Sequence, residues 1–121
     1  MGMTKPLHTV VETPDYLADA RRAGMTDAER EAAVQQYANE PDHGDEIKGS
    51  GGVRKGRLAG KGKGKSGGYR IVAVFVGAAI PVYLIGVLSK GDRENFSDAE
   101  VSQFKKVTTA LKATVRGRRR R

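Results

Sequence analysis

The residues with the clearest potential for chemistry are cations gathered in one short stretch of the chain. Residues 48–70 hold eight lysine and arginine side chains and no acidic residue, whereas residues 1–47 hold four basic and ten acidic ones. Lysine and arginine neutralise phosphates and stabilise negative charge that develops on a phosphoryl group. Because such a density of positive charge repels itself, the stretch indicates a polyanionic partner.

Two strands are predicted to position the most important of these cations. In a strand over residues 53–59, strict alternation places Lys55 and Arg57 on one face. A second strand over residues 69–76 carries Arg70 near its start. If the two strands pair as a hairpin, all three side chains converge on one surface patch.

The predicted loop between these strands, residues 60–68, places a lysine at every second position between glycines. Glycine lets backbone N–H groups approach phosphates closely. The spacing lacks the GK[ST] ending of a P-loop, so nucleoside triphosphate binding is not predicted. The further RNA-binding candidates of the two strands and the loop are Arg54, Lys61, Lys63, Lys65 and Tyr69. Tyr69 is suited equally to stacking on a base and to packing in the core.

Length and composition bound the class of protein. The chain has 121 residues, a net charge of +8 and no cysteine, so disulfides and thiolate metal sites are excluded and a single core is expected. Its first residues lack the pattern of a signal peptide. We expect one domain over residues 1–115 and a disordered basic tail over residues 116–121, in a cytoplasmic protein.

The rest of the chain predicts the elements that hold the cations in place. A short strand over residues 7–12 precedes two helices, and capping residues or capping boxes begin all three predicted helices at Thr13, Thr26 and Ser97. The last helix is expected to end near Val115. The order strand, two helices, three strands, helix predicts an α+β fold, with a small antiparallel sheet, helices on one face and an open basic face.

Residues 71–88 contain no charge and are long enough to cross a membrane as one helix. Valine and isoleucine dominate the segment, Gly77 and Gly86 interrupt it, and Pro81 lies near its middle. These features favour two buried strands joined by a turn over a membrane span.

Several motifs, in this order, resemble the RelE/HigB family of bacterial type II toxins. The similarity covers roughly residues 7–112. It is carried by His8-Thr9-Val10-Val11-Glu12-Thr13-Pro14, Gly51-Gly52-Val53-Arg54-Lys55-Gly56-Arg57-Leu58, Gly64-Lys65-Ser66-Gly67-Gly68-Tyr69-Arg70, Pro81-Val82-Tyr83-Leu84, Ser89-Lys90 and Phe96-Ser97-Asp98-Ala99-Glu100.

The resemblance implies a RelE-like fold and a ribosome-dependent endoribonuclease that cuts mRNA in the A site. In that chemistry the ribose 2′-OH attacks its own phosphodiester and leaves a 2′,3′-cyclic phosphate. The implied partners are a cognate antitoxin, mRNA and ribosomal RNA, with no cofactor, metal or membrane. By position, the implied catalytic residues are Lys55, Arg57, Arg70 and Lys90. The chain departs from some relatives at Phe96, which replaces a tyrosine and cannot transfer a proton.

Two other functions fit the same patch. One is a non-catalytic RNA-binding or ribosome-associated module, and the other is a ParE-like inhibitor of gyrase. The antitoxin is expected to use an acidic or amphipathic segment that covers the cationic face or docks on the two N-terminal helices. The only histidines, His8 and His43, are interpreted as ordinary structural residues.

Overall fold

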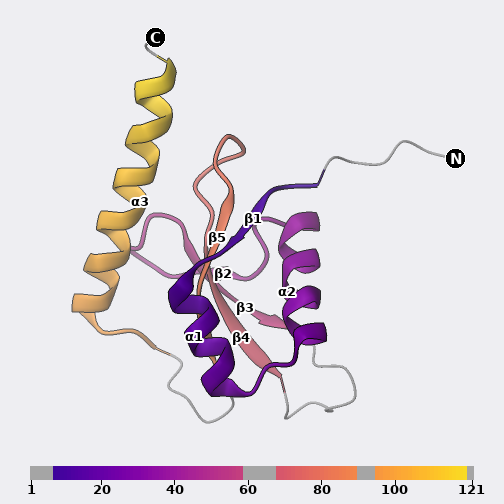
Figure 1. Ribbon diagram of the computed structural model, residues 1–121. Coiled ribbons are helices and arrows are strands. Elements are labelled where there is room, and N and C mark those ends of the chain that lie inside the picture. Colours follow the sequence, from indigo (N-terminus) through magenta and orange to yellow (C-terminus); the bar gives the residue numbers. More distant parts are fainter. Residues whose placement is uncertain (1–6, 59–67, 90–94, 120–121) are drawn as a thin grey trace, which may run out of the picture.

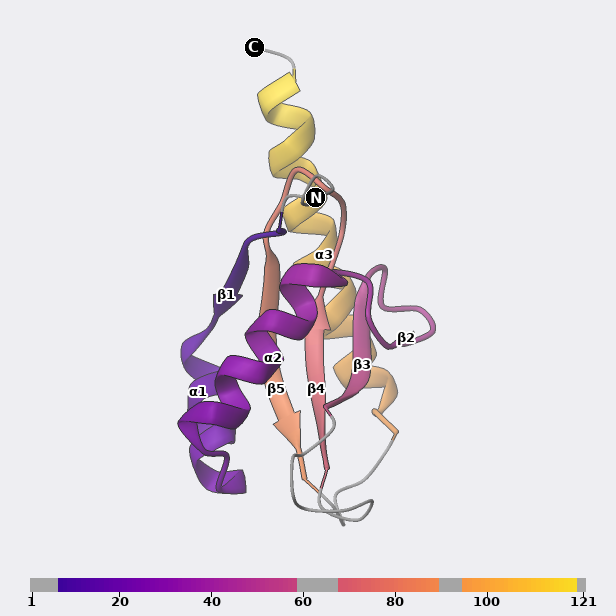
Figure 2. The same ribbon diagram turned by 90° about the vertical axis from the view of Figure 1, so that its right-hand side faces the viewer.

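The computed structural model describes residues 7–58, 68–89 and 95–119, with side chains described as far as Val115. The elements in chain order are β1 (Val10–Glu12), α1 (Pro14–Ala23), α2 (Asp27–Asn39), β2 (Asp45–Glu46), β3 (Val53–Leu58), β4 (Tyr69–Val74), β5 (Val82–Leu88) and α3 (Asp98–Arg119). They form three layers: α1 and α2 cover one face of the sheet, and α3 lies on the other (Figures 1 and 2).

The sheet has five strands in the order β1-β5-β4-β3-β2. The α+β class and the predicted elements are confirmed, with two differences in the sheet. The sheet is mixed rather than antiparallel, because β1 pairs in parallel with β5, Val10 opposite Val82. The short strand β2, which the sequence does not predict, adds an edge beside β3. Two helices separate β1 from the later strands, so local patterns carry no information on its direction.

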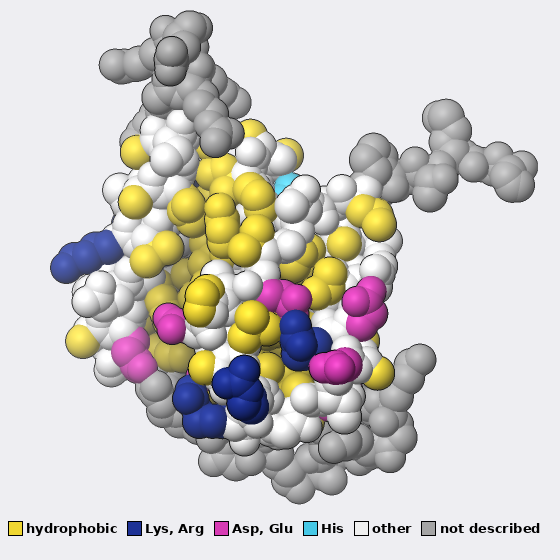
Figure 3. All heavy atoms as spheres, in the orientation of Figure 1, with side chains coloured by type: hydrophobic (Ala, Val, Ile, Leu, Met, Phe, Trp, Pro, Cys, Tyr) yellow, Lys and Arg dark blue, Asp and Glu magenta, His cyan; other side chains and the backbone are white. Residues whose placement is uncertain are grey.

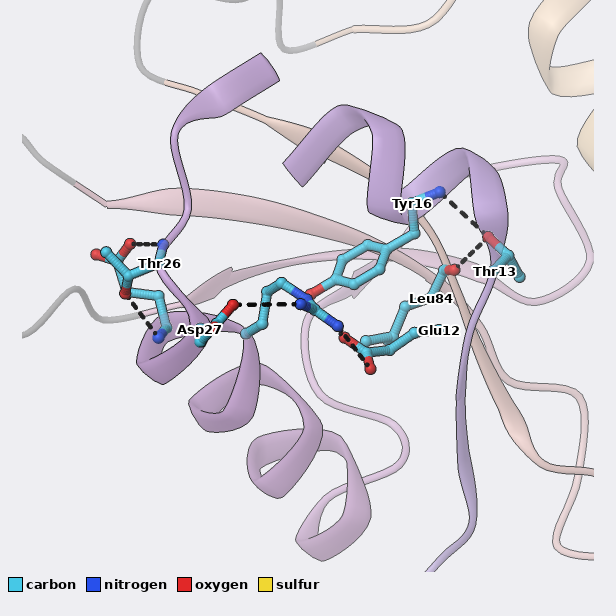
Figure 4. A network of polar contacts seen from close by, with 8 residues as sticks. Glu12, Thr13, Tyr16, Thr26, Asp27 and Leu84 are labelled. Atoms are coloured by element: carbon cyan, nitrogen blue, oxygen red, sulfur yellow. Dashed lines mark hydrogen bonds and ion pairs between the residues drawn. The ribbon is translucent and has the colours of Figure 1, made fainter. Parts of the chain in front are cut away.

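The helix starts are fixed by the side chains that the sequence predicts as caps. The Thr13 hydroxyl accepts from the Tyr16 backbone N–H and donates to the Leu84 carbonyl at 2.7 Å, which ties the start of α1 to β5 (Figure 4). Thr26 and Glu29 form a complete capping box at α2. These local hydrogen bonds satisfy N–H groups that a helix leaves unpaired, and so they set where each helix begins.

The larger core lies between the sheet and the pair α1–α2. Tyr16 and Ala20 of α1 and Tyr37 of α2 pack with Ile71 and Leu84 of the sheet, and all five are at most 1% exposed. An ion pair at 3.1 Å between Arg30 and Glu12 ties α2 to β1 at the rim of this core (Figure 4).

The second core lies on the opposite face, where α3 packs. Val53, Val72 and Val74 are buried there, with Phe104 and Leu111 of α3 packed against them. The prediction of helices on only one face is therefore wrong. The apolar stripe of α3 must be buried against another apolar surface. These valines supply that surface on the face of the sheet that was predicted to carry no helix.

One buried hydrogen bond fixes α3 to the turn before β3. The Thr108 hydroxyl donates to the Ser50 carbonyl at 2.8 Å, and both residues are fully buried. The helix continues to Arg119, beyond the end that the apolar stripe predicts near Val115. The backbone of residues 116–119 is thus helical where the sequence predicts a disordered tail.

The uncharged segment over residues 71–88 forms β4, a turn and β5, as predicted. Gly77 occupies the turn with a φ of 146°, a conformation that is open mainly to glycine. Within the described part of the chain, no helix has the length and apolar character needed to cross a membrane.

Two buried tyrosines should make the fold sensitive to alkali. Among the described residues, the hydroxyls of Tyr16 and Tyr37 have no hydrogen-bond partner. Burial raises the pKa of Tyr16 to about 12 and also raises the pKa of Tyr37. In the unfolded chain both ionise near pH 10, so folding is disfavoured above that pH by about 1.4 kcal/mol per tyrosine per pH unit.

We therefore expect the free energy of unfolding, measured in urea, to be steady up to about pH 10 and to fall between pH 10 and 12. The double substitution Tyr16→Phe and Tyr37→Phe should remove most of this fall while changing stability little at pH 7, because neither hydroxyl is paired among the described residues. An unchanged alkaline slope in the double variant would contradict this account.

Candidate functional site

The strands β3 and β4 bring three of the predicted catalytic cations together. Arg57 lies directly opposite Arg70, and Lys55 lies opposite Val72. Paired residues share a face of the sheet, and so do residues two apart on one strand. Since Val72 faces α3, the three cations lie on the α3 face. We call Lys55, Arg57 and Arg70 the cationic patch.

The patch is open to a ligand at its centre. Arg57 is exposed, and Lys55 and Arg70 are half-buried. Like charges directly opposite one another on adjacent strands destabilise a sheet. The pairing of Arg57 with Arg70 concentrates positive charge on this face, which favours an anionic ligand.

The edge strand β2 borders the patch with carboxylates that the sequence analysis missed. Asp45 lies opposite Lys55 and Glu46 lies opposite Arg54, and both acidic residues are exposed. Such opposite-charge pairs stabilise the register of an antiparallel ladder. Their negative charge makes this edge the less favourable side of the patch for an anion. A strand of two residues has no periodicity by which sequence alone could reveal it.

His43 contacts the backbone of the patch from the face of the sheet that α1 and α2 cover. Its Nε2 lies 2.9 Å from the carbonyl oxygen of Arg57, which can only accept, so this nitrogen carries the proton and donates. The imidazole packs edge-on against Tyr37, with ring centroids 5.4 Å apart. Gly56 makes room for it, because a Cβ there would lie 2.6 Å from the His43 ring. His43 thus fixes the backbone of β3 beside Arg57, a role that the sequence does not reveal.

We expect His43→Phe to lower any activity of the patch about tenfold while shifting the melting temperature by only a few degrees. Phenylalanine keeps the ring against Tyr37 but cannot donate to Arg57. The measurement is a comparison of reaction rate and thermal melt between the variant and the parent. Since His43→Gln retains a donor, its activity should lie between the two, and equal rates in all three proteins would show that the hydrogen bond is irrelevant to the patch.

Two predicted RNA-binding residues lie elsewhere. Arg54 is on the opposite face of β3, where its guanidinium donates to the Gly44 carbonyl at 2.7 Å. Tyr69 is 5% exposed in the larger core, and its hydroxyl donates to Glu29 at 3.2 Å. Of the two roles that the sequence left equal for Tyr69, the structure shows packing in the core, because the ring lies under α2. The remaining predicted cations, Lys61, Lys63, Lys65 and Lys90, lie outside the described residues.

Phe96 has a structural role. Its ring packs edge-on against Phe104 of α3 at a centroid distance of 5.3 Å, beside the smaller core. The side chain therefore helps to seat the first turns of α3 on the sheet. Its ring carries no group that exchanges a proton.

The mixed sheet lies between a helical pair and a single C-terminal helix. Cations gather on the side of that helix. These features define a small α+β protein with a cationic sheet face. The chain belongs to the RelE toxin family, because the family model described as the RelE toxin of the RelE / RelB toxin-antitoxin system matches residues 10–118. The resemblance drawn from its motifs is thus confirmed. Toxins of this family generally inhibit translation, and each is paired with an antitoxin.

Proposed function

We propose that this protein is a ribosome-dependent endoribonuclease that cuts mRNA in the A site and is neutralised by a cognate RelB-type antitoxin. The observation that carries the proposal is the direct opposition of Arg57 and Arg70 on an accessible sheet face, with Lys55 on the same side. Family membership supports the same class of activity. Ribosomal RNA and the mRNA strand provide the phosphates that such a patch binds.

The proposed reaction is an internal transesterification. The ribose 2′-oxygen forms a new bond to the adjacent phosphorus, and the bond from phosphorus to the 5′-oxygen of the next nucleotide breaks. The products are a 2′,3′-cyclic phosphate and a free 5′-OH. One proton leaves the 2′-OH and one is taken up by the departing 5′-oxygen, so the reaction needs no outside oxidant, reductant or water.

The patch suits this chemistry because negative charge builds up on the phosphoryl oxygens in the transition state. The guanidinium groups of Arg57 and Arg70 stay protonated, so their role is to hold the phosphate and stabilise that charge. Lys55 is the member of the patch whose amine can both bind the phosphate and exchange a proton. Lys61, Lys63 and Lys65 are proposed from the sequence to add contacts to RNA, and Lys90 is proposed as a further catalytic residue.

The test is to incubate translating ribosomes with the purified protein and to map the 5′ ends of the broken mRNA. Cuts confined to the A-site codon are the expected result. Binding to ribosomes without cuts would assign the protein to non-catalytic RNA-binding modules, and DNA breaks that require gyrase would assign it to gyrase inhibitors. The same protein with both Arg57→Ala and Arg70→Ala is the control, and it should leave the mRNA intact.

A further inference from the structure

Strand β5 contains a bulge that determines which of its residues face the cationic patch. Gly86 lies opposite Val72 of β4, and Leu84 lies opposite the next residue of that strand, Ala73. Ile85 is therefore an extra residue without a counterpart on β4. We call Ile85 and Gly86 the β5 bulge. One extra residue reverses the alternation of side chains along the rest of the strand.

The two cores show this reversal. Before the bulge, Leu84 packs in the larger core, under α1 and α2. After the bulge, Val87 packs in the larger core and Leu88 packs with the smaller one, on the side where Figure 3 shows a band of hydrophobic side chains between α3 and the neighbouring strands. Strict alternation from Leu84 would give Val87 and Leu88 the opposite faces. The bulge is thus the reason that Leu88, which lies opposite Arg70, is on the face of the patch.

Helix α1 binds the backbone of β5 on both sides of the bulge. β1 ends at Glu12, opposite Leu84, and α1 continues along the same edge of β5 (Figure 2). Before the bulge, the backbone N–H and the hydroxyl of Thr13 donate to the Leu84 carbonyl at 3.2 and 2.7 Å. After the bulge, the backbone N–H of Val87 donates to Oδ2 of Asp19 at 3.1 Å. α1 thus supplies the hydrogen bonds that β1 is too short to make.

Asp19 is well placed to hold the bulge. Its Oδ1 also accepts from Arg22 on the next turn of α1, so two bonds orient the carboxylate. Gly86 leaves room for this carboxylate, because a Cβ there would lie 3.2 Å from Oδ2. Val87 is only 6% exposed. Its N–H would lose its acceptor if Asp19 were removed, and an unpaired buried donor is costly.

We propose that Asp19 is a positioning residue for the cationic patch. It belongs to the helical layer across the sheet from the patch, and it acts through the β5 bulge by keeping Leu88 beside Arg70. Paired residues of adjacent strands are neighbours on one face, so Leu88 flanks Arg70 on the side away from Arg57. An apolar neighbour limits the water around a guanidinium and strengthens its attraction to a phosphate. The effect on cleavage rests on the proposed function, whereas the anchoring of the bulge does not.

The test compares Asp19→Ala and Asp19→Asn with the control Arg22→Ala. NMR measures the amide exchange of Val87 and the position of the Arg70 Nε–H signal. In Asp19→Ala, exchange at Val87 should be about tenfold faster, and the Arg70 signal should shift. Asparagine retains an acceptor oxygen, so Asp19→Asn should resemble the parent in both measurements. Arg22→Ala should do so too, because it leaves the bond to Val87 in place.

Single-turnover cleavage on translating ribosomes, with excess toxin, tests the link to the reaction. Asp19→Ala should lower the maximal rate about tenfold, while the toxin concentration that gives half of this rate changes less than about threefold. Asp19→Asn should restore the rate. Arg30→Ala breaks the ion pair between α2 and β1, so it also removes a contact that holds the helical layer to the sheet, and it should cleave at the parent rate.

If Asp19→Ala does not fold, Gly86→Ala takes its place, because the new methyl group presses on the Asp19 carboxylate from the strand. It should speed exchange at Val87 in the same direction. Unchanged exchange at Val87, or a cleavage rate in Asp19→Ala no lower than that of the parent or of Arg30→Ala, would overturn the proposal. If the parent does not cut mRNA, the proposed function fails, and the exchange at Val87 and the Arg70 signal decide the role of Asp19 by themselves.

Discussion

Arg70→Ala should lower the rate of mRNA cleavage on translating ribosomes by about 10² to 10³, the loss typical for one group that stabilises developing charge. Arg70 starts β4 and lies opposite Arg57, so its removal halves the guanidinium pair without touching the hydrophobic core. Arg70→Lys restores the charge but loses the planar fork that pairs with phosphate. Its rate should therefore lie between those of the alanine variant and the parent. The measurement is single-turnover cleavage with excess toxin.

The fold should survive this change. Arg70 is half-buried and belongs to neither hydrophobic core, so we expect the melting temperature to shift by less than about 5 °C. The matched control is Arg22→Ala on α1, whose side chain is 72% exposed and lies on the layer across the sheet from the patch. The control should cleave mRNA at the parent rate. A fully active Arg70→Ala protein, or an equal loss in Arg22→Ala, would remove the patch from the mechanism.

Gly56→Ala should destabilise the protein by about 1 to 3 kcal/mol, the usual cost of overpacking. In most strand interiors alanine is favoured over glycine, so the expected sign is reversed here by local geometry. A Cβ at Gly56 would lie 2.6 Å from the His43 ring and 2.8 Å from the Tyr37 hydroxyl. Tyr37 is 1% exposed and cannot yield, so His43 must move out and release the Arg57 carbonyl.

The change should therefore lower both stability, measured by urea unfolding, and cleavage. A double-mutant cycle with His43→Ala tests the cause, because removing the ring relieves the contact at 2.6 Å and leaves only the one with the Tyr37 hydroxyl at 2.8 Å. We expect the two substitutions together to cost less than the sum of their separate effects, by about 0.5 kcal/mol or more. Strict additivity would mean that the destabilisation arises elsewhere.

The parts of the fold that follow from neighbouring residues could be predicted from the sequence. Thr13 and Thr26 cap helices through bonds to residues three positions on, so their types and spacing were sufficient. The cationic patch was predictable for the same reason: alternation on β3 sets the face of Lys55 and Arg57, and a short hairpin fixes the neighbour.

Other features depend on contacts between distant parts of the chain. Along β4, Tyr69 and Arg70 point to opposite faces and both faces become apolar further on, so alternation could not decide which residue is buried. The bond from His43 to Arg57 joins a connector to a strand, and no spacing rule predicts it. The position of α3 was not predicted. The apolar stripe of this helix shows that it packs on the sheet but does not show on which face of the sheet it packs.

The parallel pairing of β1 with β5 has a consequence for synthesis. Val10 is made well before its partner Val82, so β1 has no place in the sheet until β5 has been synthesised. The hairpin of β3 and β4 joins segments close in sequence and closes a small loop at low entropic cost. The cations can thus be assembled before β5 is made, while a nascent chain that stops before β5 cannot complete the sheet.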